Sequence, residues 1–264
     1  MMRIDIATLF PEMCERVLDE SIIGRARRAG KLDIHCHQIR DYTLDKQKRV
    51  DDTLYGGGKG MLMQADPIFR CYEAVCQELG TRPHVVYLSP QGEVFTQKKA
   101  IQLSGYDHLL LLCGHYEGVD QRVLDEIVDE EVSIGDYVLT GGELAALVVT
   151  DAVSRMQEGV LAGEECFMEE SHWNGLLECP QYTHPAVWHG REVPAVLQSG
   201  HHANIQQWRR EHSLENTYRK RPDLLCKAQL TAKDKLFLRR LKEQIKAEGA
   251  AAGEASPPDE GEEQ

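Results

Sequence analysis

Long apolar runs, an apparent signal-peptide pattern and closely paired cysteines are all missing from these 264 residues. No apolar run approaches the roughly 20 residues needed to cross a bilayer. The stretch from Met1 to Ala7 lacks the apolar core and cleavage pattern of a signal peptide. None of the eight cysteines forms Cys-x-x-Cys, so the closely spaced thiolates typical of zinc sites are missing. We therefore predict a cytoplasmic protein that contacts no membrane, has no thiolate metal site and keeps its cysteines reduced and mostly buried.

Three nucleotide and nucleophile motifs are also missing. Lys59 is followed by Gly60 instead of Ser or Thr, which excludes a phosphate-binding loop of the form Gly-x-x-x-x-Gly-Lys-Ser/Thr. Met61 stands where the dinucleotide fingerprint Gly-x-Gly-x-x-Gly needs its last glycine, and no Gly-x-Ser-x-Gly elbow occurs. The sequence thus supports neither a nucleoside triphosphate, nor NAD, nor a serine nucleophile. The glycine run 56–60 is either a structural turn or a turn that closes over a substrate.

Positive charge is scarce overall and unevenly distributed. The formal net charge is −13, which by itself argues against a nucleic-acid partner. However, residues 247–264 carry six acids and no base, whereas residues 182–227 carry seven bases and four acids. This local basic segment is compatible with RNA binding, although such a segment is more often a solvated helix face.

Strand and helix patterns alternate along the first 160 residues, separated once by a long polar loop over 40–66. Strands are predicted over 3–10, 32–39, 85–88, 109–113 and 132–134, and helices over 12–29, 66–79, after Thr96, after Asp120 and over 144–156. This order predicts an α/β fold with a mainly parallel sheet. In such sheets ligands bind beyond the carboxyl ends of the strands.

Composition divides the chain into four segments. Residues 1–160 form the predicted ligand-binding domain, and the glycine- and glutamate-rich stretch 161–178 forms a flexible linker. Residues 179–246 are predicted to form a small helical domain. The acidic tail 247–264 is expected to be disordered.

Glycine or polar turns follow three of the predicted strands, at 89–92, 114–118 and 135–142. The carboxyl ends of parallel strands meet at one sheet edge, and glycine lets backbone amides approach a flat ligand closely. These turns therefore predict one cofactor pocket. Glu117 and Asp136 lie on the turns, where carboxylates suit a cationic ligand, a ribose or a hydrated metal.

Other polar residues near these turns admit a structural and a functional interpretation. His115 in such a position is more often hydrogen-bonded than catalytic. Asp120 is explained as a helix N-cap, and Glu143 as an acid that suits the positive end of a helix. Arg155, in the last turn of the apolar helix, needs no function, but its guanidinium could equally reach the pocket. The linker acids Glu169-Glu170 are solvated acids on composition alone.

A series of motifs runs collinearly from about residue 3 to residue 230. They are Leu9–Met13, Val50–Asp52, Tyr55–Gly58, Gly60-Met61, Leu88–Gly92, Cys113–Gly118, Ser133–Glu143, Gly175–Leu177, Pro180, Tyr182-Thr183, Val193-Pro194, Ser199-Gly200, Trp208-Arg209 and Arg221–Leu225. In this order they resemble the bacterial tRNA (guanine-N1)-methyltransferases, the TrmD family of the SPOUT class, whose members methylate the guanosine 3′ to the anticodon. The motifs are too many and too ordered for chance.

The resemblance implies a deep trefoil knot, a homodimer, and S-adenosylmethionine bound by the knot loops. A magnesium requirement, with Glu117 at the substrate loop, is also implied, although no sequence pattern demonstrates a metal site. The implied loops are the same three turns that predict a pocket from the residues alone. Carried over residue by residue, the cofactor-binding positions are Tyr87, Leu88, Ser89, Pro90, Gly92, Gly114, Tyr116, Glu117, Ser133, Ile134, Gly135, Asp136, Tyr137, Val138, Leu139, Gly141 and Gly142.

Methyl transfer to guanine N1 requires a general base for the N1 proton and a positive group near O6, where negative charge develops. The family uses an aspartate in the linker as base and an arginine at the end of the apolar helix. The arginine position matches Arg155. The aspartate position matches Glu170, which is a departure, and Glu169 just before it is the alternative base.

The anticodon stem-loop of tRNA is the partner that the resemblance implies for the second domain. Two residues depart from the family's motifs there, because His184 replaces an arginine and His201 replaces an asparagine. The residues expected to contact the RNA are Glu117, Arg209, Arg210, Arg219, Lys220 and Arg221.

Two other interpretations stay open on the sequence. One is an enzyme of the same class that acts at another RNA site, against which the Tyr55–Gly58 turn and the linker argue. The other is a non-catalytic RNA-binding protein that holds S-adenosylmethionine, an interpretation suggested by the altered acid at position 170. An assay of methyl transfer separates this second interpretation from an enzyme.

Overall fold

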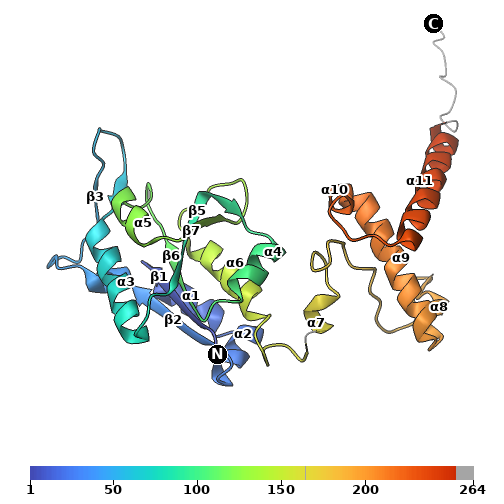
Figure 1. Cartoon of the computed structure of the whole chain (residues 1–264), viewed down its shortest axis with the longest axis horizontal. Helices are drawn as coiled ribbons and strands as arrows, with labels where there is room; N and C mark the ends of the chain where they lie inside the picture. Colours follow the sequence, from blue (N-terminus) through green and yellow to red (C-terminus); the bar gives the residue numbers. More distant parts are fainter. Residues whose placement is uncertain (164, 254–264) are drawn as a thin grey trace, which may run out of the picture. The chain divides into compact units, whose positions relative to one another are not determined.

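The computed structural model of the protein describes residues 1–163 and 165–253. The chain divides after Phe167 into two compact units, which are coloured blue to yellow and yellow to red in Figure 1. The first unit contains the central sheet, and the second consists mainly of helices.

A five-stranded sheet of parallel strands forms the centre of the first unit, in the order β2-β1-β6-β5-β7. Its strands are β1 (Arg3–Thr8), β2 (Asp33–Gln38), β5 (His84–Val94), β6 (His108–Cys113) and β7 (Glu130–Ser133). The predicted α/β fold with a mainly parallel sheet is confirmed.

Successive residues of the central strand β6 enter two separate hydrophobic cores, one on each face of the sheet. Leu109, Leu111 and Cys113 pack into one core, and Leu110 and Leu112 into the other. This division follows from the two-residue period of a strand. It also explains the unbroken apolar run, because a parallel strand covered on both faces has no polar side.

Helices cover both faces of this sheet (Figure 1). The first core contains residues of α1 (Pro11–Leu18), α2 (Ser21–Arg28), α4 (Gln97–Leu103) and α6 (Glu143–Ser154). The second contains residues of α3 (Ala65–Leu79) and α5 (Gln121–Ile127). The predicted N-caps are confirmed, since the Thr96 side chain accepts a hydrogen bond from Lys99 N at 3.3 Å and that of Asp120 accepts one from Arg122 N at 3.0 Å.

Two local predictions were wrong. The helix predicted over 12–29 is interrupted, because α1 ends at Leu18 and α2 begins at Ser21. Gly24 packs directly on the carbonyl of Asp19, where an added Cβ would lie 1.9 Å from the oxygen. The segment 40–66 is not simply a loop, because it contains a short hairpin of β3 (Asp51–Thr53) and β4 (Met61–Met63), after the 3₁₀ turn Ile39–Tyr42.

Helices α9 (His202–Lys220) and α11 (Ala232–Gly253) form most of the second unit, where Leu176, Leu214 and Leu241 are buried. The chain enters this unit through the short helix α7 (Glu165–Met168). The remaining elements are β8 (Val187–Trp188), β9 (Arg191–Glu192), α8 (Ala195–Gln198) and α10 (Pro222–Leu225).

The two segments expected to lack structure are partly ordered. The end of segment 161–178 is fixed to α9, because Thr217 Oγ1 accepts a hydrogen bond from Leu177 N at 2.9 Å and Asn216 Nδ2 donates one to Glu178 O at 2.9 Å. Helix α11 continues through residues 247–253, within the segment expected to be disordered. The rest of that prediction, for 254–264, lies outside the described residues.

Within the described ranges, no helix has the length and apolar character required to cross a membrane. The eight cysteines are free thiols. Cys14, Cys71, Cys113 and Cys179 are buried, whereas Cys166 and Cys226 are exposed, so burial is less general than the sequence predicts.

Candidate functional site

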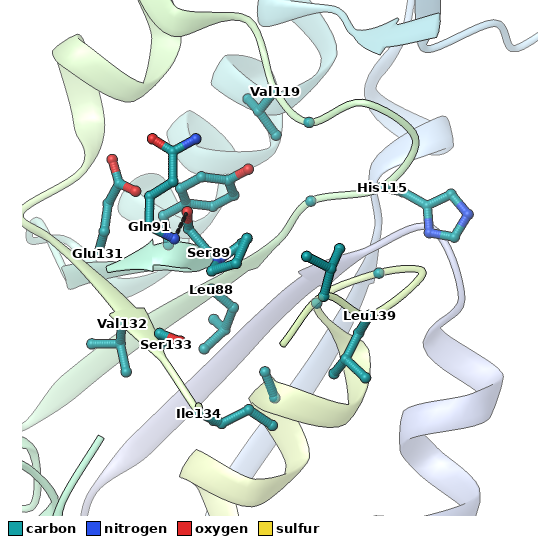
Figure 2. A pocket seen from close by; sticks show the side chains of 18 of the residues that line it. Leu88, Ser89, Gln91, His115, Val119, Glu131, Val132, Ser133, Ile134 and Leu139 are labelled. Carbon is teal, nitrogen blue, oxygen red and sulfur yellow. Dashed lines mark hydrogen bonds between the residues drawn. The ribbon is translucent and has the colours of Figure 1, made fainter. Parts of the chain in front are cut away.

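A cavity of about 410 Å³ lies at the carboxyl ends of β6 and β7 and beside the middle of β5. Segment 89–91 of β5 and loops 114–118 and 134–142 surround it, and Figure 2 shows their side chains converging from the three strands. The structure brings together the three segments singled out in the sequence, but the turn predicted at 89–92 was wrong, because β5 continues to Val94 past a shift in its pairing with β7. Their assignment to a cofactor stays a prediction.

Most of the predicted cofactor positions line this cavity. Gly92 and Asp136 do not. Gly92 is required by the sheet instead, because an added Cβ would lie 2.4 Å from Val132 N, and Asp136 is exposed. The predicted residues that do line the cavity are Tyr87, Leu88, Ser89, Pro90, Gly114, Tyr116, Glu117, Ser133, Ile134, Gly135, Tyr137, Val138, Leu139, Gly141 and Gly142.

Segment 89–91 lies within β5, where the pairing with β7 shifts register between Leu88 and Glu93. Ser89 is buried, and its Oγ accepts a hydrogen bond from Gln91 N at 3.1 Å, drawn as a dashed line in Figure 2. Burial raises the pKa of Tyr87 to about 12, so its hydroxyl stays protonated at neutral pH. Gly114 allows this ring to lie against β6, since an added Cβ would be 2.8 Å from the Tyr87 hydroxyl oxygen.

The second loop is supported by the hairpin β3–β4. Glu117 N donates to Met61 O, and Met63 N donates to Gly118 O, both at 3.0 Å. Gly60, the last glycine of the 56–60 run, makes room for the Glu117 side chain, because an added Cβ would lie 2.5 Å from its Cγ. One glycine of that run therefore has a structural role beside the cavity.

The third loop approaches the second backbone to backbone. Gly142 N donates to Gly114 O at 2.9 Å, and His115 and Gly141 form an isolated bridge. An added Cβ on Gly142 would lie 2.8 Å from Cys113 Cα. Only glycine fits this position without moving the end of the central strand.

A buried carboxylate fixes the start of α6 below this contact. Glu143 is 4% exposed, and its Oε1 accepts a hydrogen bond from Thr8 Oγ1 at 2.7 Å. Thr8 Oγ1 in turn accepts one from Phe10 N at 2.9 Å. Glu143 thus links the carboxyl end of β1 to the N-terminus of α6, which is more than the dipole role predicted for it.

The His115 ring points outward in Figure 2, and its centroid lies 5.1 Å from that of Phe10. Its backbone N donates to Met63 Sδ at 3.2 Å. These contacts agree with a structural role for His115.

The charges around the cavity restrict its ligand. Among the described residues that line it, the acidic ones are Glu117 and Glu131, and none is a lysine or arginine. Tyr137 and Val138 line it while 53% and 81% exposed, so apolar surface is available for a ligand to cover. A cavity with two acids and no lysine or arginine suits a cationic ligand with a flat apolar part, and is unfavourable for phosphates.

Several lining residues were not predicted as cofactor positions. Gln91 and Thr140 lie within the motifs Leu88–Gly92 and Ser133–Glu143, and Glu131 lies two residues before the second of these, so their place in the sequence was a usable signal. Gln121 and Leu124 come from α5. Nothing in the local sequence marks them, because helix packing positions them.

Arg155 is the C-cap residue of α6, with its backbone N donating to Asp151 O at 3.1 Å, and it does not line the cavity. The cavity adjoins the opposite end of α6, where Gly142 and Ala145 line it. Twelve helical residues rise roughly 18 Å at 1.5 Å per residue, so the two ends are well separated. Glu170 belongs to the second unit, where it is half-buried and its carbonyl accepts from Trp173 N at 3.4 Å.

Acidic partners face most of the basic residues predicted to contact RNA. Arg210 binds Asp234 with two hydrogen bonds, at 2.8 and 3.2 Å, and this arrangement lowers the pKa of Asp234. Arg209 is farther from its acid, with 3.9 Å between its Nη1 and Glu169 Oε2. Further ion pairs join Arg219 to Glu215 at 2.9 Å and Arg221 to Asp223 at 2.7 Å, while Lys220 is exposed.

No group of three or more His, Cys, Asp or Glu side chains in the described ranges is arranged to hold a metal ion. Glu117, the residue linked by resemblance to magnesium, lies at the cavity edge beside Gly60.

Comparison with known proteins supports an assignment. The family model "tRNA (Guanine-1)-methyltransferase TrmD" matches residues 2–227. A protein of Ruminiclostridium cellulolyticum named tRNA (guanine-N(1)-)-methyltransferase is 55% identical over 86% of this chain and 97% of its own length. Proteins of the same name from Alkaliphilus oremlandii and Caldanaerobacter subterraneus are 54% and 55% identical over 91% and 89% of this chain, and 99% and 96% of their own lengths. Because the family model and these relatives match most of the chain, including the segments around the cavity, this protein belongs to the tRNA (guanine-1)-methyltransferase family.

Proposed function

We propose that this chain is a tRNA (guanine-N1)-methyltransferase that transfers the methyl group of S-adenosylmethionine to N1 of the guanosine immediately 3′ of the anticodon. Family membership over residues 2–227 carries the proposal. The cavity agrees with it, because two acids and an apolar rim, with no lysine or arginine in the lining, suit a sulfonium ligand.

The residues present fit the proposed cofactor. The glycines at 114, 141 and 142 expose backbone to the cavity, the apolar side chains of Val138 and Leu139 can cover a flat base, and Glu117 and Glu131 supply negative charge. When bound, S-adenosylmethionine supplies an activated methyl group on a positively charged sulfur.

Glu170 is proposed as the general base that takes the N1 proton of guanine, with Glu169 as the alternative. Glutamate carries the same carboxylate as aspartate on a longer stem, so it can perform the same proton transfer. Arg155 is proposed to stabilise the negative charge that develops on O6.

A homodimer is proposed because of where Arg155 lies. It stands at the end of α6 roughly 18 Å from the end that adjoins the cavity. An arginine that must act beside the methyl group is therefore better supplied to this cavity by a second copy. The apolar side chains Leu144 and Val148 on the same helix are 49% and 47% exposed and suit a subunit contact.

A trefoil knot is proposed for the first unit. It is supported by the path of residues 134–142, which leave the edge strand β7, pass the end of β5 and reach the central strand β6 at Gly114. A connection that passes over one strand to contact the end of the next is compatible with a threaded chain, which is rare in proteins.

The proposed function is tested by transfer of labelled methyl from S-adenosylmethionine to two tRNA transcripts that differ only in having guanosine or adenosine 3′ to the anticodon. Labelling confined to the guanosine transcript is expected. Equal labelling of both would indicate another RNA site. Cofactor binding without labelling would indicate a binding protein that has lost catalysis. Measuring the rate with and without added magnesium would test the magnesium requirement that the family resemblance implies.

A further inference from the structure

The second unit has a cavity of its own, about 530 Å³ in volume, between segment 180–186 and helices α8 and α9. All of its walls come from the second unit. Its size lies in the range of roughly 300–1,000 Å³ typical of sites for small molecules and groups.

Aromatic rings form one wall of this cavity. The ring centroids of the lining residues Tyr182 and Trp208 are 6.3 Å apart. The ring of His212, which does not line the cavity, has its centroid 4.1 Å from that of Trp208 and supports it. Trp208 is held by α9, whereas Tyr182 is 49% exposed. The cavity therefore offers an anchored aromatic group and an open ring, against which a planar group can stack.

The other walls combine amides with one permanent positive charge. Gln181 and Gln198 carry donors and acceptors suited to the edge of a nucleobase. Arg209 is the arginine among the lining residues that the structure describes, and none of them is acidic. This charge is opposite to that of the first cavity, and it favours a planar group attached to a phosphate.

Arg209 also connects this cavity to the proposed catalytic segment. Its guanidinium lies 3.9 Å from the carboxylate of Glu169, the residue before Glu170. An RNA phosphate bound at Arg209 would therefore belong to a nucleotide near the target guanosine, whose N1 proton Glu170 would remove.

We infer that this second cavity binds an unstacked base of the anticodon loop, next to the target guanosine. The base stacks on Tyr182 and Trp208, and its phosphate pairs with Arg209. Single-stranded loops are recognised in this way by many RNA-binding proteins, through aromatic stacking and contacts to base edges. This inference rests on the proposed function, since it takes the RNA substrate from it.

The test uses the full-length protein and an anticodon stem-loop RNA in which 2-aminopurine replaces one loop base at a time. Quenching of the probe on binding is expected at one loop position with the wild-type protein, and loss of that quenching with Tyr182→Leu. The dissociation constant for RNA should rise about 5- to 150-fold, the range of base–aromatic stacking. Tyr182→Phe should restore both values, because the ring is retained.

Trp188→Leu is the matched control, since Trp188 is 63% exposed in the same unit but does not line the cavity. It should leave the quenching unchanged. Salt dependence adds an independent measurement: Arg209→Gln should reduce the slope of log affinity against log salt by about 1, whereas Tyr182→Leu should not change the slope.

Three results would overturn the inference. The first is that Tyr182→Leu binds the RNA and quenches the probe as the wild type does. If the wild type also transfers methyl groups, this result would contradict the inference about the cavity but not the proposed function. The second is binding of free guanosine monophosphate as tight as that of the stem-loop, which would indicate a mononucleotide site. The third is a change of oligomeric state in Tyr182→Leu with normal RNA affinity, which would indicate a protein contact. Absence of methyl transfer by the wild type would count against the proposed function, and the probe quenching would still decide the cavity.

Discussion

Replacing Gly142 by alanine tests how the cavity is built. The added Cβ would lie 2.8 Å from Cys113 Cα and 3.2 Å from both Cys113 Cβ and Gly114 N. These atoms belong to the buried central strand and its first loop residue, so they cannot rotate away. Gly142 has a φ of −80°, which alanine adopts readily, so any effect comes from this contact and not from backbone strain.

The expected cost is that of overpacking a core, about 1–3 kcal/mol. If residues 135–142 stay in place, the free energy of unfolding falls by this amount. If they shift to relieve the contact, stability is retained and the affinity for S-adenosylmethionine falls by about 5- to 150-fold, the same free energy expressed as binding. Urea unfolding and calorimetric titration with the cofactor measure the two quantities.

Gly105→Ala is the matched control. Gly105 is exposed, and an added Cβ would have Gln102 O as its nearest neighbour, at an ordinary contact distance of 3.4 Å. It should change neither quantity. The reasoning would be refuted if Gly142→Ala unfolded and bound cofactor like the wild type, because the close approach of the two loops would then have no energetic consequence.

Three further substitutions address the buried carboxylate, the second unit and the proposed base. Thr8→Val removes the hydroxyl donor to the buried Glu143 at nearly constant volume, and should lower the free energy of unfolding by about 2 kcal/mol in urea titrations. Arg210 lowers the pKa of Asp234 in the folded protein, so this ion pair stabilises the fold at pH values above the unfolded-state pKa of about 3.9. The stabilisation is lost as the pH falls through the lower pKa of the folded state, and Asp234→Asn should remove this loss. Glu170→Gln should reduce the single-turnover rate of methyl transfer by about 10²- to 10⁴-fold with little change in cofactor affinity.

Each of these has a result that contradicts it. Thr8→Ser keeps the donor, so an equal loss in Thr8→Val and Thr8→Ser would point to packing instead of the hydrogen bond. Parallel stability profiles of wild type and Asp234→Asn between pH 6 and 3 would show that the pair with Arg210 adds nothing. Full turnover in Glu170→Gln would remove Glu170 as the base.

Local signals predicted the central elements well. The apolar run Leu109–Cys113 identified the central strand because both of its faces are covered. Thr96 and Asp120 identified helix starts because an N-cap depends only on the next few residues.

Features that depend on contacts distant in sequence were not predicted. The hairpin that contains Asp51 and Met61 has no alternating pattern, and its second strand pairs with the loop at Glu117, more than fifty residues away. The strand ends that form the cavity were predicted because parallel strands share one edge. Partners such as Leu124 were missed because the sequence does not say which helix packs beside that edge.

The contact of Gly141 and Gly142 with the end of β6 also affects inhibitor design, because it limits which substitutions the protein can tolerate. There the wall of the cavity is main chain, so its shape cannot be altered gradually by exchanging side chains. A compound that hydrogen-bonds to these peptide groups would leave few single substitutions able to weaken it without also destabilising the fold. Resistance would then have to arise at the rim, where Tyr137 and Val138 are exposed and free to vary.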